Sequence, residues 1–352
     1  MTAGAMTAGL TARGRVALAG FAAALAAAPA VVDRYMLSIL LLCLINAYLG
    51  QAWNILMGFC GLLSLGHALY LGLGAYASAI LFVKFGVGPW LGVFVAMAVA
   101  AAAAGVLGWL GFRFRIEGVY FSLLTIAFAE VARIGFDNWG FAGGAGGFFL
   151  PVSSEGRGHG WDLRGGPVFF YYLALALAAG ALALSAHLRA SKLGHAWLAV
   201  REDPAAAKAL GVNATRVRFA ALFISAAMTA VGGVFLAFWS NTLFPAQIFD
   251  MGRSIDMILG PIVGGVGTLF GPIVGAFLLT PLGEALIDLL RAVGLNAPGA
   301  KALVYGALLM VIIAATPNGL WPWIARRLKL EPPATAGAEA APQKDAPQKD
   351  AA

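Results

Sequence analysis

Long uninterrupted apolar stretches constrain what this chain can fold into more than any other feature of its sequence. Each is close to the about 20 apolar residues that a helix needs to cross a bilayer, whereas a membrane β-strand would alternate apolar and polar residues. We therefore expect an all-α, polytopic transmembrane helical bundle of about ten spans. The stretches cover residues 16–32, 35–57, 62–83, 89–111, 118–136, 167–186, 219–240, 254–270, 271–290 and 302–317.

The composition leaves little room for a soluble domain. Of the 352 residues, 61% are apolar and 11% are charged, whereas an average soluble domain has about 25% charged residues. No polar stretch exceeds about 30 residues, which excludes a large catalytic or ATP-binding domain outside the membrane. The chain also lacks the G-x-x-x-x-G-K-[ST] phosphate loop and any nucleophile–base or metal-ligand pattern. We therefore expect no enzyme activity, no cofactor and no metal site in this chain.

The basic residues are unevenly distributed between the two sides of the predicted spans. With a cytoplasmic N-terminus and one crossing per stretch, 15 of the 23 Lys and Arg residues fall in cytoplasmic loops, 7 fall in external loops, and Arg133 lies within a span. This bias follows the positive-inside rule and favours cytoplasmic positions for both termini. It accounts for the net charge of +7 without a nucleic-acid partner. The first apolar stretch is also compatible with a cleaved signal peptide, but the membrane helices that follow it favour a retained span.

The spans and loops divide the chain into three parts. We expect a cytoplasmic N-terminal segment at 1–15, a transmembrane domain at 16–325, and a disordered cytoplasmic tail at 326–352, where APQKD occurs twice in a row. Within the transmembrane domain we expect an external loop at 137–166 and a cytoplasmic loop at 187–218.

Residues 254–290 allow two topologies, because both ends of this stretch lie on the external side of the predicted arrangement. Two full spans would bring the total to ten, whereas a re-entrant hairpin that returns to its own side would leave eight. Irregular backbone at membrane depth must be buried in protein or face water. We therefore expect the glycines here to serve either close helix packing or a flexible, path-lining backbone. They include Gly264, Gly265, Gly267 and Gly271.

The predicted cytoplasmic loop contains a compact helix signature. Asp203 can cap a helix N-terminus, Pro204 suits the first helical position, and Gly211 can take the left-handed conformation that ends a helix. Such a short, smooth helix can insert into a groove of another protein, or it can be a connector at the membrane surface. The residues between its ends are good helix formers, namely Ala205, Ala206, Ala207, Lys208, Ala209 and Leu210.

Polar residues inside predicted spans are the other candidate functional positions. His67 has small residues beside it and either bonds a neighbouring helix or lines a path. Glu130 lies about 18 Å into its span and can pair with Arg133. This pair is either a structural ion pair or a contact for a passing zwitterionic amino acid. The candidate residues around His67 are Ser64, Gly66, His67 itself and Gly72.

Four ordered stretches resemble the permeases of bacterial ABC importers and, more narrowly, the LivM-type permeases of branched-chain amino acid importers. The resemblance covers about residues 35–325. The stretches are G-L-L-S-L-G-H-A-L-Y-L-G-L-G-A-Y at 61–76, G-V-Y-F-S-L-L-T-I-A-F-A-E-V-A-R at 118–133, the loop at 191–218 with its R-E-D-P-A-A-A-K-A-L-G-V, and G-G-V-G-T-L-F-G-P-I-V-G-A at 264–276.

The resemblance implies a permease subunit of an ATP-driven importer in the bacterial inner membrane. A sister permease would pair with this chain, two cytosolic ATPases would dock beneath it and bind the ATP, and a periplasmic binding protein would deliver branched-chain or other hydrophobic amino acids. The coupling helix of the family maps onto Glu202 to Gly211. Urea, short amides or aromatic acids are alternative cargoes. The alternative from another class is an ion-coupled secondary transporter that uses Glu130 and Asp256.

Overall fold

A computed structural model describes most of the chain. Nine of the 16 residues in the predicted span at 302–317 lie outside the described residues, as do residues 152–162 of the predicted external loop and the tail from residue 331. The described residues are 11–151, 163–292 and 319–330, with single positions at 299, 303, 306, 307, 310, 311, 314 and 316.

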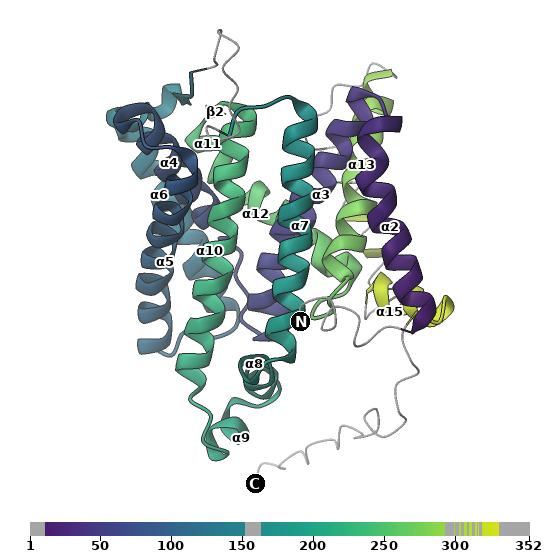
Figure 1. Ribbon diagram of the computed structural model, residues 1–352. Coiled ribbons are helices and arrows are strands. Elements are labelled where there is room, and N and C mark those ends of the chain that lie inside the picture. The colour runs from purple at the N-terminus through teal and green to yellow at the C-terminus, as the bar shows by residue number, and fades with distance from the viewer. Residues whose placement is uncertain are drawn as a thin grey trace.

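Helices dominate the described residues, and two short strands form an antiparallel pair (Figure 1). The long helices are α2 (Ala12–Val31), α3 (Arg34–Asn54), α4 (Ala68–Phe85), α5 (Pro89–Arg113), α6 (Val119–Asn138), α7 (Pro167–Ala190), α10 (Ala214–Ser240) and α13 (Gly271–Ala292). The shorter elements are η1 (Ile55–Phe59), η2 (Gly140–Ala142), η3 (Gly144–Gly146), β1 (Phe148–Phe149), α8 (Lys192–Glu202), α9 (Pro204–Ala209), β2 (Thr242–Leu243), α11 (Pro245–Ile248), α12 (Met251–Gly264) and α15 (Leu320–Arg327).

Eight helices in the described part of the chain are long and apolar enough to cross a membrane. They correspond to eight of the ten predicted stretches, and α3 continues without a break into η1. The prediction of a polytopic helical bundle is therefore confirmed. The predicted stretch at 254–270 instead forms the short helix α12, whose 14 residues rise about 21 Å.

Helices α12 and α13 form a hairpin of unequal arms, joined by a turn at 265–270. Their backbones touch through glycine: a Cβ atom on Gly264 would lie 1.8 Å from the Gly271 carbonyl oxygen, and one on Gly275 would lie 1.8 Å from that of Gly260. Gly265 and Gly267 have positive φ angles, which glycine adopts without strain. The spacing of the glycines thus serves close backbone contact between the two arms.

The helices pack in two groups that meet at α3 and α10. In one group α4, α5 and α10 contact one another, and in the other α3 contacts α7, α12 and α13. Helix α5 joins its group through small buried residues spaced four apart, which let helices approach closely. These are Gly92, Ala96, Ala100, Ala104 and Gly108.

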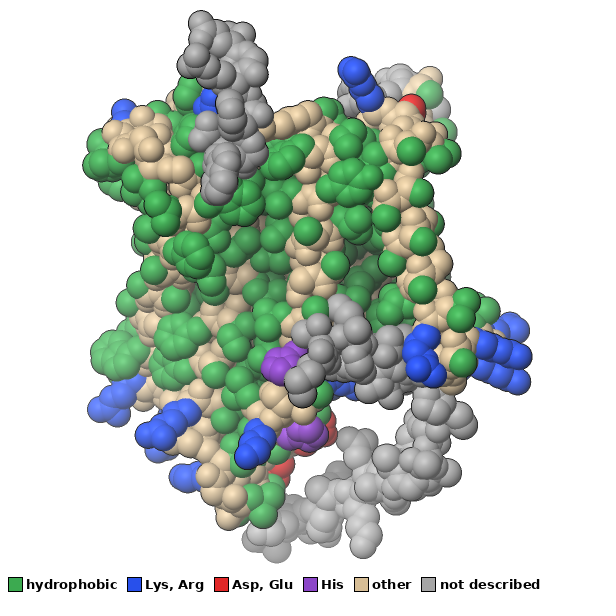
Figure 2. Space-filling view, viewed as in Figure 1, with side chains coloured by type: hydrophobic (Ala, Val, Ile, Leu, Met, Phe, Trp, Pro, Cys, Tyr) green, Lys and Arg blue, Asp and Glu red, His purple; other side chains and the backbone are tan. Residues whose placement is uncertain are grey.

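The surface has a broad hydrophobic band, and Lys and Arg side chains gather at the end of the bundle that carries α8, α9 and α15 (Figure 2). The beginning of α2 and the end of α15 lie at this same end, where the Thr11 amide donates to the Leu330 carbonyl oxygen at 2.8 Å. We call it the basic end, and the end with β2 and α11 the opposite end. The arrangement agrees with the positive-inside pattern of the sequence.

Candidate functional site

The α8–α9 loop projects from the basic end of the bundle (Figure 1). The Asp203 carboxylate caps α9 by accepting hydrogen bonds from the amides of Ala205 at 2.7 Å and Ala206 at 3.1 Å. Pro204 opens the helix, and Gly211 follows it in the left-handed conformation. Ala207 is buried against the protein, whereas the other residues of α9 are exposed. The helix therefore presents a small-residue surface to the outside.

The predicted coupling segment from Glu202 to Gly211 is not one helix. Glu202 is the last residue of a separate helix, α8, which Ser191 caps through its hydroxyl. The extended backbone of Asp203 separates the two helices. Helix α8 was not predicted from the sequence, because it lacks the run of alanines that marks α9, although Ser191 is a residue type that caps helices. Lys208 lies on α9 and is exposed.

Two side chains of α8 attach the loop to the transmembrane helices. Trp197 is completely buried, and its indole nitrogen donates to the Val217 carbonyl oxygen on the first turn of α10 at 2.8 Å. The guanidinium of Arg201 donates to the carbonyl oxygen of Gly58 in η1. The loop is thus held to α10 and to the continuation of α3.

Hydrogen bonds also join the last residue of α3, next to η1, to the turn between α12 and α13. The Asn54 side chain accepts from the Gly267 amide at 2.8 Å and donates to the Thr268 carbonyl oxygen at 2.9 Å. Arg201 packs against the same turn, because a Cβ atom on Gly267 would lie 2.7 Å from its guanidinium. A continuous set of contacts therefore joins α8 to the α12–α13 hairpin.

Residues 61–67 form a non-helical segment between η1 and α4, where the sequence predicts an apolar span from 62. Polar side chains of other helices satisfy its backbone, as irregular chain at membrane depth requires. The Thr125 hydroxyl accepts from the amides of Leu65 and Gly66, each at 3.1 Å, and Trp53 donates to the Ser64 carbonyl oxygen at 2.8 Å. Only glycine fits at position 66, because a Cβ atom there would lie 2.0 Å from the Thr125 carbonyl oxygen.

His67 lies at the end of this segment and is fully buried. Its Nδ1 atom lies 3.1 Å from the Ser64 hydroxyl, and its Nε2 atom lies 2.9 Å from the Ser225 hydroxyl. Because Ser225 donates its own proton to the Ala52 carbonyl oxygen at 2.7 Å, it must accept from Nε2–H. The chain of bonds assigns His67 the neutral Nε2–H form, with Ser64 donating to Nδ1. Gly72 is also buried and faces the ring of Phe249.

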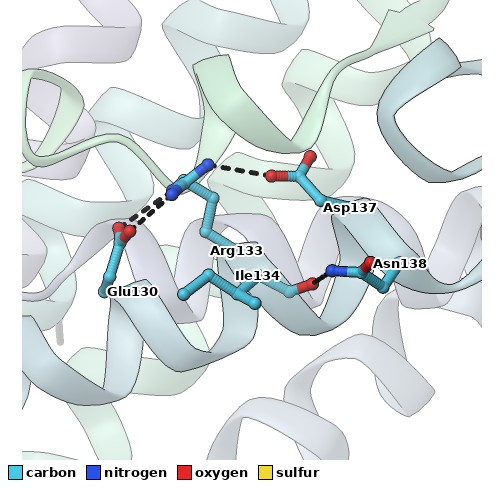
Figure 3. Close-up of polar contacts among 5 residues, drawn as sticks. All are labelled: Glu130, Arg133, Ile134, Asp137 and Asn138. Carbon is cyan, nitrogen blue, oxygen red and sulfur yellow. Dashed lines mark hydrogen bonds and ion pairs between the residues drawn. The ribbon is translucent and has the colours of Figure 1, made fainter.

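Glu130, Arg133 and Asp137 form an ion triad along α6 (Figure 3). The Arg133 guanidinium lies between the two carboxylates, with Nε donating to Glu130 at 2.9 Å and Nη1 donating to Asp137 at 2.8 Å. The Glu130 side chain is 50% exposed, whereas those of Arg133 and Asp137 are 29% and 21% exposed. The pairing predicted for Glu130 and Arg133 is present, but Glu130 faces the outside of this chain and not its interior.

Comparison with known proteins places this arrangement in a family. A sequence profile described as "Branched-chain amino acid transport system / permease component" matches residues 35–313. The chain belongs to this permease family. It is 31% identical over 333 residues to the high-affinity branched-chain amino acid transport system permease protein LivM of Escherichia coli K12, covering 89% of this chain and 76% of LivM.

Further relatives agree with this assignment. LivM of Salmonella typhimurium is 31% identical over 86% of this permease and 74% of its own length. LivH of Escherichia coli K12, another high-affinity branched-chain amino acid transport system permease protein, is 32% identical over 40% of this permease and 42% of its own length. No solved structure gives a significant match. The resemblance stated from the sequence is therefore confirmed, and this permease is a multi-pass membrane protein.

A cavity lies near the opposite end of the bundle, and no sequence motif predicts it as a site. Residues from six elements line it, among them Arg253 and Asp256 of α12 and Glu284 of α13. From the sequence, Asp256 is a candidate for ion coupling and both Asp256 and Glu284 are expected near interfaces or in the bundle interior, but no local motif joins them with Arg253. Within the described ranges, no group of three His, Cys, Asp or Glu side chains is arranged to hold a metal ion.

Proposed function

We propose that this permease is a subunit of an ABC importer in a bacterial inner membrane and that it carries branched-chain or other hydrophobic amino acids inward. The observation that supports this most directly is the form of the α8–α9 loop. Its exposed surface consists of small residues, and its buried surface is attached to α10 and η1. A surface of this kind fits a groove in a partner and transmits a displacement to the membrane helices.

The partner that supplies this groove is a cytosolic ATPase. We found no phosphate-binding loop in this chain, so energy from ATP has to enter from another polypeptide. The basic end then faces the cytoplasm, as the positive-inside rule requires, and both termini of the chain lie on that side.

The complete importer contains a sister permease, two ATPase subunits and a periplasmic binding protein. Similarity to both LivM and LivH, each a permease protein of a high-affinity branched-chain amino acid system, supports a pair of related permeases. The half-exposed Glu130 supports the same conclusion, because an ionisable group within a span has to face protein or water.

Reconstitution tests the proposal. This permease, its sister permease, the ATPases and the binding protein are placed in proteoliposomes, and uptake of L-leucine is measured with and without ATP. We expect uptake that requires ATP hydrolysis, and a preference for L-leucine over urea and benzoate. Leucine uptake that an ion gradient drives without the ATPases would refute the importer and favour a secondary transporter.

A single substitution tests the docking surface. Ala206 is exposed on α9, so Ala206→Glu introduces a charge into the proposed interface without touching the interior of the permease. We expect the variant to insert normally but to lose ATPase association in co-purification. Ala190→Glu is the matched control, because Ala190 is an exposed alanine at the end of α7, outside α9. Normal association of Ala206→Glu would contradict the assignment.

A further inference from the structure

A cavity of about 250 Å³ lies between α3, α10, α12 and α13, close to β2 and α11. It is therefore near the opposite end of the bundle, away from the α8–α9 loop (Figure 1). Much of its wall is aliphatic or otherwise apolar. The apolar residues include Leu42, Ile45, Leu49, Leu236, Leu243 and Met257.

Charged side chains of both signs line the same cavity. Arg253 and Asp256 lie one turn apart on α12, and Glu284 lies on the facing helix α13. In the described part of the chain, none of the three forms an ion pair. Asp256 and Glu284 are partly buried, whereas Arg253 is exposed.

These unpaired groups contrast with the triad on α6, where Arg133 has a carboxylate on each side. Charged residues near or within a membrane domain pair with one another or face a water-filled cavity, and such positions mark substrate pathways. A cavity that keeps one cation and two carboxylates apart is therefore suited to a ligand that carries both charges itself.

We propose that this cavity is a transient binding site for a zwitterionic amino acid with an aliphatic side chain. The guanidinium of Arg253 binds the α-carboxylate, for which its planar donors are well matched. Asp256 and Glu284 bind the ammonium group, and the aliphatic side chain lies against the apolar wall. The assignment rests on the proposed function, because it names the place where this permease holds the importer's cargo.

The lining disfavours other classes of ligand. A metal cation would be repelled by Arg253, and an inorganic anion by the two carboxylates. A sugar needs many hydrogen-bonding partners, whereas ligand sites of this kind combine an apolar wall with a few polar groups. An amino acid with a hydrophobic side chain can contact both the apolar residues and the charged side chains of the cavity wall.

The cavity also touches the hairpin that the α8–α9 loop contacts. Gly260 of α12 and Ala276 of α13 line it, and these residues lie where the two helices pack together. The turn at the other end of the hairpin is bonded to Asn54 and packs against Arg201. A bound amino acid therefore contacts the same two helices that the coupling loop reaches.

Charge-neutralising variants test the site in the reconstituted importer. We expect Arg253→Gln, Asp256→Asn and Glu284→Gln each to lower ATP-driven L-leucine uptake about tenfold, the effect of one lost charged contact. The ATPase activity stimulated by the loaded binding protein should persist, because the α8–α9 loop is unchanged. Arg34→Gln is the control, since Arg34 is exposed at the start of α3 and does not line the cavity. Normal leucine uptake in all three cavity variants would overturn the assignment.

Protection from labelling measures occupancy directly and does not need transport. Cys43 and Cys60 are buried, so a cysteine introduced by Gln247→Cys at the cavity wall can be labelled selectively with a maleimide in the complex in nanodiscs. We expect L-leucine to slow this labelling with half-protection near about 1 mM, the weak affinity of a site that must release its ligand. Ala246→Cys, exposed and outside the cavity, should be labelled at the same rate with or without leucine.

Two leucine analogues test whether the site recognises the ammonium group and the carboxylate. 4-Methylpentanoate lacks the ammonium group of leucine and 3-methylbutylamine lacks the carboxylate, so both should protect Gln247→Cys at least about tenfold less well than L-leucine. Equal labelling with and without up to about 50 mM L-leucine, far above the affinity expected here, would overturn the site even if the importer works. A complex that shows leucine protection but no ATP-driven uptake would instead refute the proposed function and leave the site intact.

Discussion

Arg201→Ala removes the hydrogen bond that joins the α8–α9 loop to η1. The guanidinium donates to the Gly58 carbonyl oxygen and packs against the turn at Gly267. A hydrogen bond from a charged donor contributes about 1.5–3 kcal/mol, and we take the lower value because Arg201 is exposed. About 1.4 kcal/mol corresponds to a tenfold change in an equilibrium. We therefore expect the coupling between loop and hairpin to weaken about tenfold.

The assay is the ratio of leucine transported to ATP hydrolysed in proteoliposomes. Because α9 keeps its cap and its exposed surface, the variant should bind the ATPases normally and hydrolyse ATP. The uptake of leucine for each ATP should fall about tenfold. Trp197 still holds α8 to α10 at 2.8 Å, so the loop should remain folded.

Arg216→Ala is the matched control, because Arg216 is an exposed arginine at the same end whose backbone amide alone is bonded to the Asn213 cap. It should leave the transport ratio unchanged. If Arg201→Ala transports as much leucine for each ATP as the unsubstituted permease, the contact with Gly58 does not carry the coupling and the reasoning fails.

Three further substitutions test the interior and the outer face. Gly66→Ala should lower the Tm in detergent, because the new Cβ would lie 2.0 Å from the Thr125 carbonyl oxygen and overpacking costs about 1–3 kcal/mol; an unchanged Tm would refute this packing. His67→Phe removes the imidazole partner of the buried Ser64 and Ser225 hydroxyls, although Ser225 keeps its bond to the Ala52 carbonyl oxygen. It should destabilise the protein by about 1–3 kcal/mol, whereas the exposed His195 should tolerate the same change. Glu130→Gln should weaken co-purification of the sister permease while the Tm of the isolated chain changes little; intact assembly with altered leucine uptake would place Glu130 on the transport path.

Eight of the ten predicted stretches could be recognised as spans from the sequence, because the bilayer imposes a similar length on every crossing helix. The α9 cap was also predictable, since Asp203, Pro204 and Gly211 act within a few residues of one another. The non-helical segment at 61–67 could not be predicted from the sequence. Its apolar residues are typical of a membrane helix. The side chains that bond its backbone in place of helical hydrogen bonds are those of Thr125 and Trp53, in other parts of the chain.

The cavity could not be predicted either, because residues that are distant in the sequence form its wall. Asn46 and Thr280 are bonded to each other at 3.1 Å across 234 positions of sequence, and both line it. No motif links Arg253 with Glu284, since they come together only when α12 and α13 pack. The direction of Glu130 was equally unpredictable, because helical spacing identifies its partner Arg133 but does not reveal which face of α6 remains uncovered.

That uncovered face bears on how the cell makes this protein. Glu130 stands near the middle of α6 with half of its side chain uncovered, so a copy inserted alone holds a carboxylate against lipid. If the proposed sister permease covers this face, synthesis of the two chains in equal numbers avoids such copies. On the same proposal, the uncovered carboxylate is a surface feature that distinguishes an unassembled copy from an assembled one.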